Sequence, residues 1–285
     1  MGDIGCRVKD GLVQIRAIAL VDNTSSSADL KTVHGLGIYI ETRKHKLLFD
    51  LGPDDTCFVN AEKLGVDLAE VDTVVISHGH YDHGGALARF LDINGKANIY
   101  IRRQAFEPHF ARAGGEDEFI GLDPELAKDV RIVFTDSAVE IDDELFVFSD
   151  IRQSLGTQSS LALFKGAPDE FVQDDFDHEQ SLIVTTEGKA VLFSGCSHSG
   201  IPGILSAALR RQPYIDAVFG GFHLFNPNTG VYESDELIET LAGELSMETP
   251  VFYTCHCTGD NAFARMRETM GEKLQYFSVG SIVEL

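Results

Sequence analysis

One short segment, residues 77–84, constrains what this chain can fold into more than any other. Its sequence is Ser77-His78-Gly79-His80-Tyr81-Asp82-His83-Gly84, and it follows residues 71–76, an apolar run rich in β-branched side chains. Such a run predicts a buried strand. A strand that ends at this cluster delivers four ligand-type side chains into one loop at the edge of a sheet. Imidazole and carboxylate groups together suit zinc, iron or manganese.

The spacing within this loop predicts that its four ligand-type side chains serve two neighbouring metal positions. His78 and His80 lie two positions apart in an extended segment, so both rings can face one metal ion. Asp82 and His83 follow as the chain turns, and they can point at a neighbouring position. Such a cluster can begin a two-metal site. One loop cannot complete two coordination shells, so further ligands must come from later in the chain.

The length and charge of the chain limit the classes of protein that fit it. With 285 residues, it is long enough for one large layered domain over residues 1–285. The net charge of −22 repels phosphate backbones, so we expect a small-molecule substrate and no nucleic acid. No apolar run approaches the roughly 20 residues of a bilayer span, so we expect no membrane association.

The first residues and the cysteines indicate a cytoplasmic protein. Charged side chains interrupt positions 1–21, which therefore do not read as a signal peptide. The five cysteines are an odd number without framework spacing. This favours reduced thiols over disulfides.

Strands and helices alternate along both halves of the chain. Predicted strands cover residues 13–21, 37–40, 46–49, 71–76, 98–101, 131–134, 145–148, 160–164, 181–185, 190–193, 217–219, 251–253 and 274–279. Predicted helices cover residues 60–64, 85–91, 106–112, 201–209, 235–244 and 262–270. Mixed strands with helices on both outer faces indicate an α/β (α+β) protein, a four-layer αββα sandwich.

Four later ligand-type residues lie at or near predicted strand ends. They are His178, Cys196, His198 and His256. A single histidine is weak evidence for a metal site. Downstream of the first cluster, the four together favour metal binding.

The motifs resemble those of metallo-β-lactamase-fold hydrolases, whose signature is a His-x-His-x-Asp-His loop. Residues 195–198, 220–224 and 255–259 are similar to one subgroup in particular, as are residues 21–23 and 34–36. This subgroup includes the archaeal 7,8-dihydropterin-6-yl-methyl-4-(β-D-ribofuranosyl)aminobenzene 5'-phosphate synthases. The resemblance spans nearly the whole chain and implies the metallo-β-lactamase fold.

The family pattern also implies a ligand set. It places His78 and His80 with a third histidine on one metal, and His178 is the expected third ligand. It assigns Asp82, His83 and His256 to a second metal. Cys196 stands where the wider family has a bridging aspartate. We expect His198 rather than Cys196 to ligate, while a single-metal site stays open as an alternative.

Other residues receive roles beside these ligands. The resemblance implies that Asp50 orients a ligating imidazole. His223 follows two glycines and is our first candidate for substrate binding or proton transfer, and His34 is a weaker one. We expect His45 and His109 to be exposed and outside the site. Cys255 and Cys257 are expected to pack in the core.

The expected function is that of a hydrolase, or a related lyase or transferase, that uses metal-activated water. Zinc, as one or two ions, is the expected cofactor, with iron or manganese as alternatives. Asp82 would position the nucleophile, and His223 would steady the leaving group or an oxyanion. The substrate would be a phosphoester, a lactone or a pterin-ribosyl compound. A mononuclear iron dioxygenase acting on a thiol and a non-catalytic metal-binding domain are the competing hypotheses.

Overall fold

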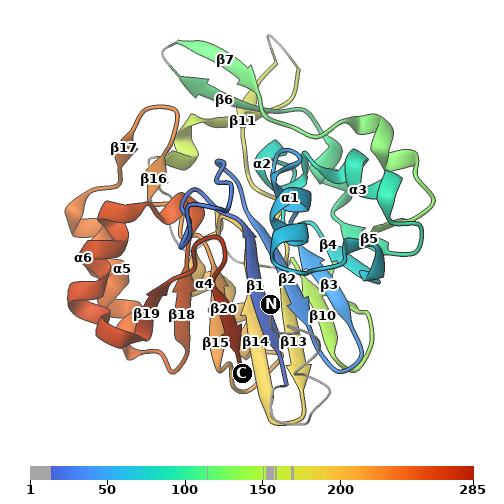
Figure 1. Ribbon diagram of the computed structural model, residues 1–285. Coiled ribbons are helices and arrows are strands. Elements are labelled where there is room, and N and C mark those ends of the chain that lie inside the picture. Colours follow the sequence, from blue (N-terminus) through green and yellow to red (C-terminus); the bar gives the residue numbers. More distant parts are fainter. Residues whose placement is uncertain (1–13, 114, 150, 152–156, 158, 168–169) are drawn as a thin grey trace.

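Two β-sheets face each other in the computed structural model, and helices cover the outer face of each (Figure 1). The structure describes residues 14–113, 115–149, 151, 157, 159–167 and 170–285. Residues 1–13 lie outside this set, including Val13, which we predicted to begin the first strand.

The first sheet has an antiparallel half and a parallel half that meet at β3. Its strand order is β20 (Ile282–Glu284), β1 (Arg16–Val21), β2 (Gly37–Glu41), β3 (Lys46–Phe49), β4 (Thr73–Val75), β5 (Asn98–Ile101) and β8 (Ile132–Phe134). Strands β20 to β3 pair antiparallel, and β3 to β8 pair parallel. The carboxyl ends of β3 and β4 therefore lie side by side.

The second sheet repeats this plan, with β14 as the junction. Its order is β19 (Leu274–Tyr276), β18 (Val251–Thr254), β15 (Ala217–Gly220), β14 (Lys189–Phe193), β13 (Ser181–Thr186), β10 (Leu145–Phe148) and β9 (Val139–Glu140). Strands β14, β15, β18 and β19 run parallel. Their carboxyl ends therefore open at one edge of the sheet.

The alternation of side chains along each strand builds three apolar layers. In β1, Ile18 and Leu20 pack against helices, whereas Ala17 and Ala19 pack against the other sheet. Both sheets contribute to this central layer, which holds large buried side chains such as Phe49, Phe193 and Phe219. Because such strands are buried between a central and an outer apolar layer, their sequences are nearly continuous apolar runs.

The helices form the two outer layers. Those beside the first sheet are α1 (Thr56–Lys63), α2 (Tyr81–Gly84) and α3 (Leu87–Ile93), and those beside the second sheet are α4 (Ile201–Leu209), α5 (Asp235–Met247) and α6 (Asp260–Met270). The predicted αββα sandwich is thus confirmed. Within the described residues, none of these helices combines the length and apolar character that crossing a bilayer would need.

A small sheet that we did not predict lies beyond the sandwich (Figure 1). Its order is β12 (Val172–Gln173), β11 (Leu163–Lys165), β6 (His109–Ala113) and β7 (Glu116–Phe119). The helix predicted for residues 106–112 is wrong, because β6 occupies most of that range. Residue Phe110 pairs with Phe119 and also with Phe164, far along the chain. Local periodicity does not reveal such a distant partner.

The structure also contains a hairpin of β16 (Phe225–Asn226) and β17 (Val231–Tyr232) that the sequence did not lead us to predict.

His45, expected to be exposed, joins the two halves of the chain at the sheet edge opposite the loop of residues 77–84. Its Nδ1 lies 2.9 Å from Asp72 and its Nε2 lies 2.6 Å from Asp142. Hydrogen bonds to these two carboxylates, above all Asp72, outweigh partial burial and raise the pKa of His45 to about 9. The imidazolium form is therefore favoured in the folded state.

We predict that His45→Gln lowers stability in a pH-dependent way. The pKa rises on folding, so the contribution is fully present below about 6.5 and is lost as the pH passes about 9. After allowance for solvent screening, the loss at pH 6 should be about 1 kcal/mol. Urea unfolding at pH 6, 8 and 10 measures it, with Arg43→Gln in the same turn as the control. A difference that stays constant from pH 6 to pH 10 would contradict this assignment.

Candidate metal centre

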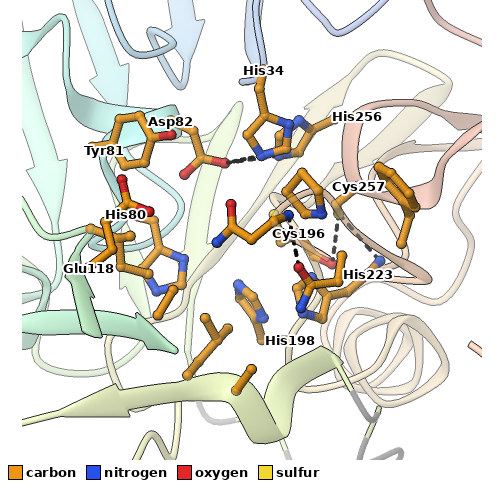
Figure 2. A pocket seen from close by; sticks show the side chains of 18 of the residues that line it. His34, His80, Tyr81, Asp82, Glu118, Cys196, His198, His223, His256 and Cys257 are labelled. Atoms are coloured by element: carbon orange, nitrogen blue, oxygen red, sulfur yellow. Dashed lines mark hydrogen bonds and ion pairs between the residues drawn. The ribbon is translucent and has the colours of Figure 1, made fainter. Parts of the chain in front are cut away.

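Loops from both sheets meet at the carboxyl ends of the parallel strands. The loop after β4 carries His78 and His80, and α2 carries Asp82 and His83. In the second sheet, Cys196 and His198 follow β14, His223 follows β15, and His256 follows β18. All of these side chains except His78 and His83 line one pocket (Figure 2). His78 and His83 lie beside them, within the same groups of ligand atoms. The parallel halves of the two sheets thus place segments distant in sequence around a common space.

The first donor group consists of three buried histidines. One ring nitrogen from each of His78, His80 and His198 lies within 4.8 Å of the other two. Both nitrogens of His198 and the Nε2 atoms of His78 and His80 are buried without a hydrogen-bond partner among the described residues. Leaving such atoms unpaired costs about 1–3 kcal/mol each. A cation held by the three rings would remove that cost.

The second donor group combines a carboxylate, a thiol and two imidazoles. Asp82, His83, Cys196 and His256 place one ligand atom each within 4.8 Å of the others. The Cys196 sulfur lies 3.1 Å from His83 Nε2, and Asp82 lies 3.2 Å from His256 Nε2. This set suits zinc, because zinc accepts sulfur, nitrogen and oxygen ligands. The structure therefore places both Cys196 and His198 among the donors, in different groups.

Buried partners fix the orientation of the ligand rings. Asp50 accepts hydrogen bonds from the Ser77 backbone at 2.7 Å and from His83 Nδ1 at 2.6 Å. The His83 Nε2 is thereby left facing the second group. On the other side, Asn23 Oδ1 accepts from His256 Nδ1 at 3.0 Å, and Asp22 accepts from the His256 backbone at 2.7 Å. Asp22 and Asn23 had no predicted role.

The loop after β14 is held in a strained conformation by Glu179. Its two carboxylate oxygens accept from the backbone nitrogens of His198 at 2.7 Å and Ser199 at 2.9 Å. Ser197, just before, has a φ of 58°, and His223 and His256 have φ values of 50° and 51°. Non-glycine residues rarely adopt this left-handed conformation, and such strain clusters at functional sites. Glu179 gave no recognisable signal in the sequence.

Burial and neighbouring charges together set the protonation of the donors. Burial lowers the pKa of His83, but the Asp50 and Asp82 carboxylates outweigh it and raise that pKa above the usual value. Burial lowers the pKa values of His78, His80 and His198 well below the usual range, and neighbouring imidazoles lower them further. Burial alone would raise the pKa of Asp82, but His83 and the adjacent imidazoles outweigh it and hold that pKa well below the usual range. Neutral imidazoles and an ionised carboxylate are the forms that bind metal.

The position of His178 differs from the expected one. We expected it to complete the group of His78 and His80, but His198 lies there instead. His178 accepts from the Gly79 backbone through Nδ1 at 2.9 Å and donates through Nε2 to Asp174 at 3.2 Å. Both ring nitrogens of His178 therefore have hydrogen-bond partners, whereas those of His198 have none among the described residues.

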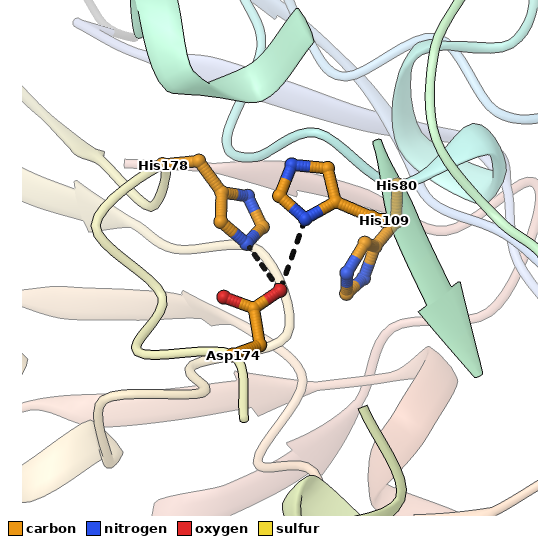
Figure 3. Close-up of side chains that lie close together, drawn as sticks. All are labelled: His80, His109, Asp174 and His178. Carbon is orange, nitrogen blue, oxygen red and sulfur yellow. Dashed lines mark hydrogen bonds and ion pairs between the residues drawn. The ribbon is translucent and has the colours of Figure 1, made fainter. Parts of the chain in front are cut away.

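Figure 3 shows His178 in a third cluster with His109, Asp174 and His80, the last of which it shares with the first donor group. His109, expected to be exposed in a helix, is buried on β6. Its Nδ1 lies 3.0 Å from Asp174, and its Nε2 lies 3.1 Å from the Gln104 carbonyl oxygen. Through Asp174 and His178, the small sheet is thus connected to Gly79 in the loop after β4. The hydrogen bonds within this cluster indicate a structural support.

The pocket between the donor groups and the small sheet encloses about 650 Å³, its open mouth included. His34, on the loop before β2, points its Nε2 at Asp82 from 3.3 Å. His223 lies opposite, and both of its ring nitrogens are buried without a hydrogen-bond partner in the described part of the chain. The small sheet and the β16–β17 hairpin supply the remaining wall, with Arg112, Glu118, Asn226 and Asn228 among its side chains.

Comparisons with known proteins agree with this architecture. The family model of the Metallo-beta-lactamase superfamily matches residues 33–208, more than half of the 285-residue chain. The crystal structure of Tm1679, described as a metal-dependent hydrolase of the beta-lactamase superfamily, superposes with a TM-score of 0.79. It is 29% identical and covers 95% of this chain and 99% of its own.

Two proteins of Methanocaldococcus jannaschii are similar over nearly their whole length. One is 7,8-dihydropterin-6-methyl-4-(beta-D-ribofuranosyl)-aminobenzene-5'-phosphate synthase, 25% identical over 271 residues, with 88% of this chain and 90% of that protein covered. The other is an uncharacterised protein, 28% identical over 272 residues, with 93% of this chain and 98% of that protein covered.

We predict that Asp50→Asn weakens cation binding at the second donor group. An amide cannot accept from Ser77 and His83 as a carboxylate does, so the His83 ring loses its fixed orientation. Loss of such an outer contact typically costs about 10–100-fold in metal affinity. Zinc titration of the metal-free protein measures the change. Asp216→Asn, which alters a carboxylate bound to the Ala190 backbone, is the control; equal affinities in both variants would refute the assignment.

Proposed function

Because the chain belongs to the metallo-β-lactamase superfamily, we propose that it is a hydrolase that activates water between its two donor groups. The observation that carries this proposal is the pair of adjacent donor groups on one pocket. Their unpartnered ring nitrogens fit one or two cations. When bound, such cations lower the pKa of water to about 7 and polarise the substrate.

Asp82 and His223 have the positions that the reaction would need. The Asp82 carboxylate lines the pocket and belongs to the second group, where it can position the attacking water. His223 lies across the pocket from Asp82 with no competing partner for its ring among the described residues. It can donate to an oxyanion or to the leaving group. His34 holds Asp82 in place from the solvent side.

The substrate that we propose is a small anionic molecule. A relative that matches along most of the chain is named for a phosphorylated pterin-ribosyl product, which supports a phosphoester or pterin-ribosyl substrate over a lactone. It also supports the related lyase or transferase chemistry. Arg112 is the one arginine or lysine among the described pocket residues, and its guanidinium lies 4.6 Å from the centre of the Phe164 ring. Its Nε and Nη2 donate to Asp117 at 2.6 and 3.2 Å, which leaves Nη1 for a ligand. We assign Arg112 to the anionic end of the substrate.

Zinc is the proposed cation, because Cys196 adds a sulfur ligand to one group. Iron or manganese would fit the three-histidine group equally well by ligand type. The accessible pocket opposes a purely metal-storing or sensory domain, which needs no substrate cleft. The cysteines within the described residues are free thiols, which supports the proposed cytoplasmic location.

We predict that His80→Ala loses both bound cation and activity. It removes one of three rings in the first group, so hydrolysis should fall by more than about 100-fold. Elemental analysis and assays with phosphodiesters, lactones and phosphorylated pterins measure this. His45→Gln, at the opposite sheet edge, should retain both. Full metal content and activity in His80→Ala would refute the proposal. Stoichiometric iron with oxygen-dependent turnover of a thiol would indicate the dioxygenase instead.

We further predict that Arg112→Ala raises KM for anionic substrates about tenfold while kcat changes little, since the charge acts on binding rather than on the reacting atoms. Steady-state assays on a phosphorylated substrate and its uncharged counterpart separate the two effects. Arg265→Ala, which removes an exposed arginine paired with Asp235 and Glu239, is the control. Equal loss on both substrates would contradict the assigned contact.

A further inference from the structure

One wall of the pocket carries a second thiol that the proposed mechanism does not use. Cys257 lines the pocket together with Cys196 and His223. The two sulfurs and one His223 ring nitrogen lie within 4.8 Å of one another, and all three residues are buried. Cys196 also belongs to the group of Asp82, His83 and His256, whereas Cys257 does not. The Cys196 sulfur is therefore placed between two sets of donors.

The His223 ring indicates independently that something binds here. Only 8% of this residue is exposed, yet neither ring nitrogen has a hydrogen-bond partner among the residues that the structure describes. Its ring centre lies 4.2 Å from that of His198. Its backbone φ of 50° is unfavourable for a histidine with no function. A buried imidazole without a partner is costly, and a bound ligand would supply the missing contact.

The surroundings of Cys257 differ from those of an ordinary core cysteine. Its sulfur accepts from the His223 backbone at 3.3 Å and lies 3.6 Å from the Cys196 carbonyl oxygen. A side chain at Gly221 would place its Cβ 2.4 Å from this sulfur, so only glycine admits the sulfur there. Cys255, two residues earlier, packs instead in the apolar layer between the sheets. Cys255 is thus a natural control.

We propose that Cys196, His223 and Cys257 form an additional site for a thiophilic divalent cation, in which Cys196 is shared with the second donor group. Two thiolates and one imidazole are the ligand set of one class of catalytic zinc site, which keeps a fourth position open. Here the open position would face the pocket. Thiolates select zinc over magnesium and manganese. The proposal rests on the proposed function through the shared Cys196, and it assigns His223 to this cation in place of the proton-donating role given above.

Cobalt(II) titration of the metal-free, full-length protein tests this site without an activity assay. Cobalt bound to thiolate absorbs in the near ultraviolet, and the absorption grows with the number of sulfur ligands. We expect Cys257→Ala to bind one equivalent fewer than the wild type and to lose about two thirds of this absorption, since two of the three cobalt–sulfur bonds are removed. Cys255→Ala should match the wild type in both respects.

A second variant keeps the test decisive if Cys257→Ala folds poorly. His223→Gln should lose the same equivalent of cobalt. Unchanged stoichiometry and absorption in folded Cys257→Ala or His223→Gln would overturn the proposal. Hydrolysis by a wild type whose thiolate absorption persists undiminished in Cys257→Ala would refute this site and leave the proposed function standing. Thiolate absorption that depends on Cys257, in a protein that hydrolyses none of the substrates, would support this site and refute the proposed function.

Discussion

Two protonated imidazoles repel each other strongly when they are buried in contact, and this repulsion constrains the whole candidate site. The ring centres of His78 and His83 lie 4.1 Å apart, and those of His109 and His178 lie 4.0 Å apart. Such packing is stable only if most rings stay neutral or lie beside a carboxylate. Burial keeps His78, His80 and His198 neutral, while Asp50, Asp82 and Asp174 lie beside the other rings. The protonation pattern and the packing therefore depend on each other.

Much of the framework could be predicted from local patterns, because it depends on side-chain alternation and on loops at strand ends. The run before Ser77 indicated a buried strand, and β4 ends at residue 75 as the motif requires. Burial on both faces explains why strands such as β14 were recognisable as apolar runs. The αββα arrangement then follows from the need to cover two sheets on their outer faces.

The features that were missed depend on contacts between distant segments. His178 and His198 are both histidines at strand ends, and the hydrogen bonds that His178 makes with Gly79 and Asp174 distinguish it from His198. His109 lies in a segment with helical periodicity, yet β6 pairs with β11, more than 50 residues away. Cys257 was expected to pack in the core, and its position beside Cys196 results from the backbone turn after β18. No local pattern encodes these neighbours.

The small sheet over the pocket has a consequence for how this architecture can diversify. Its strands come from two separate excursions of the chain, β6–β7 and β11–β12, while the donors stand on the sandwich beneath. Insertions or exchanges in the turns of these hairpins, away from His109 on β6 and from Asp174 after β12, would reshape the entrance and leave the donor framework intact. The candidate metal ligands and the pocket wall are thus encoded in different segments of the chain, so that the wall can change during evolution while the ligand set is kept.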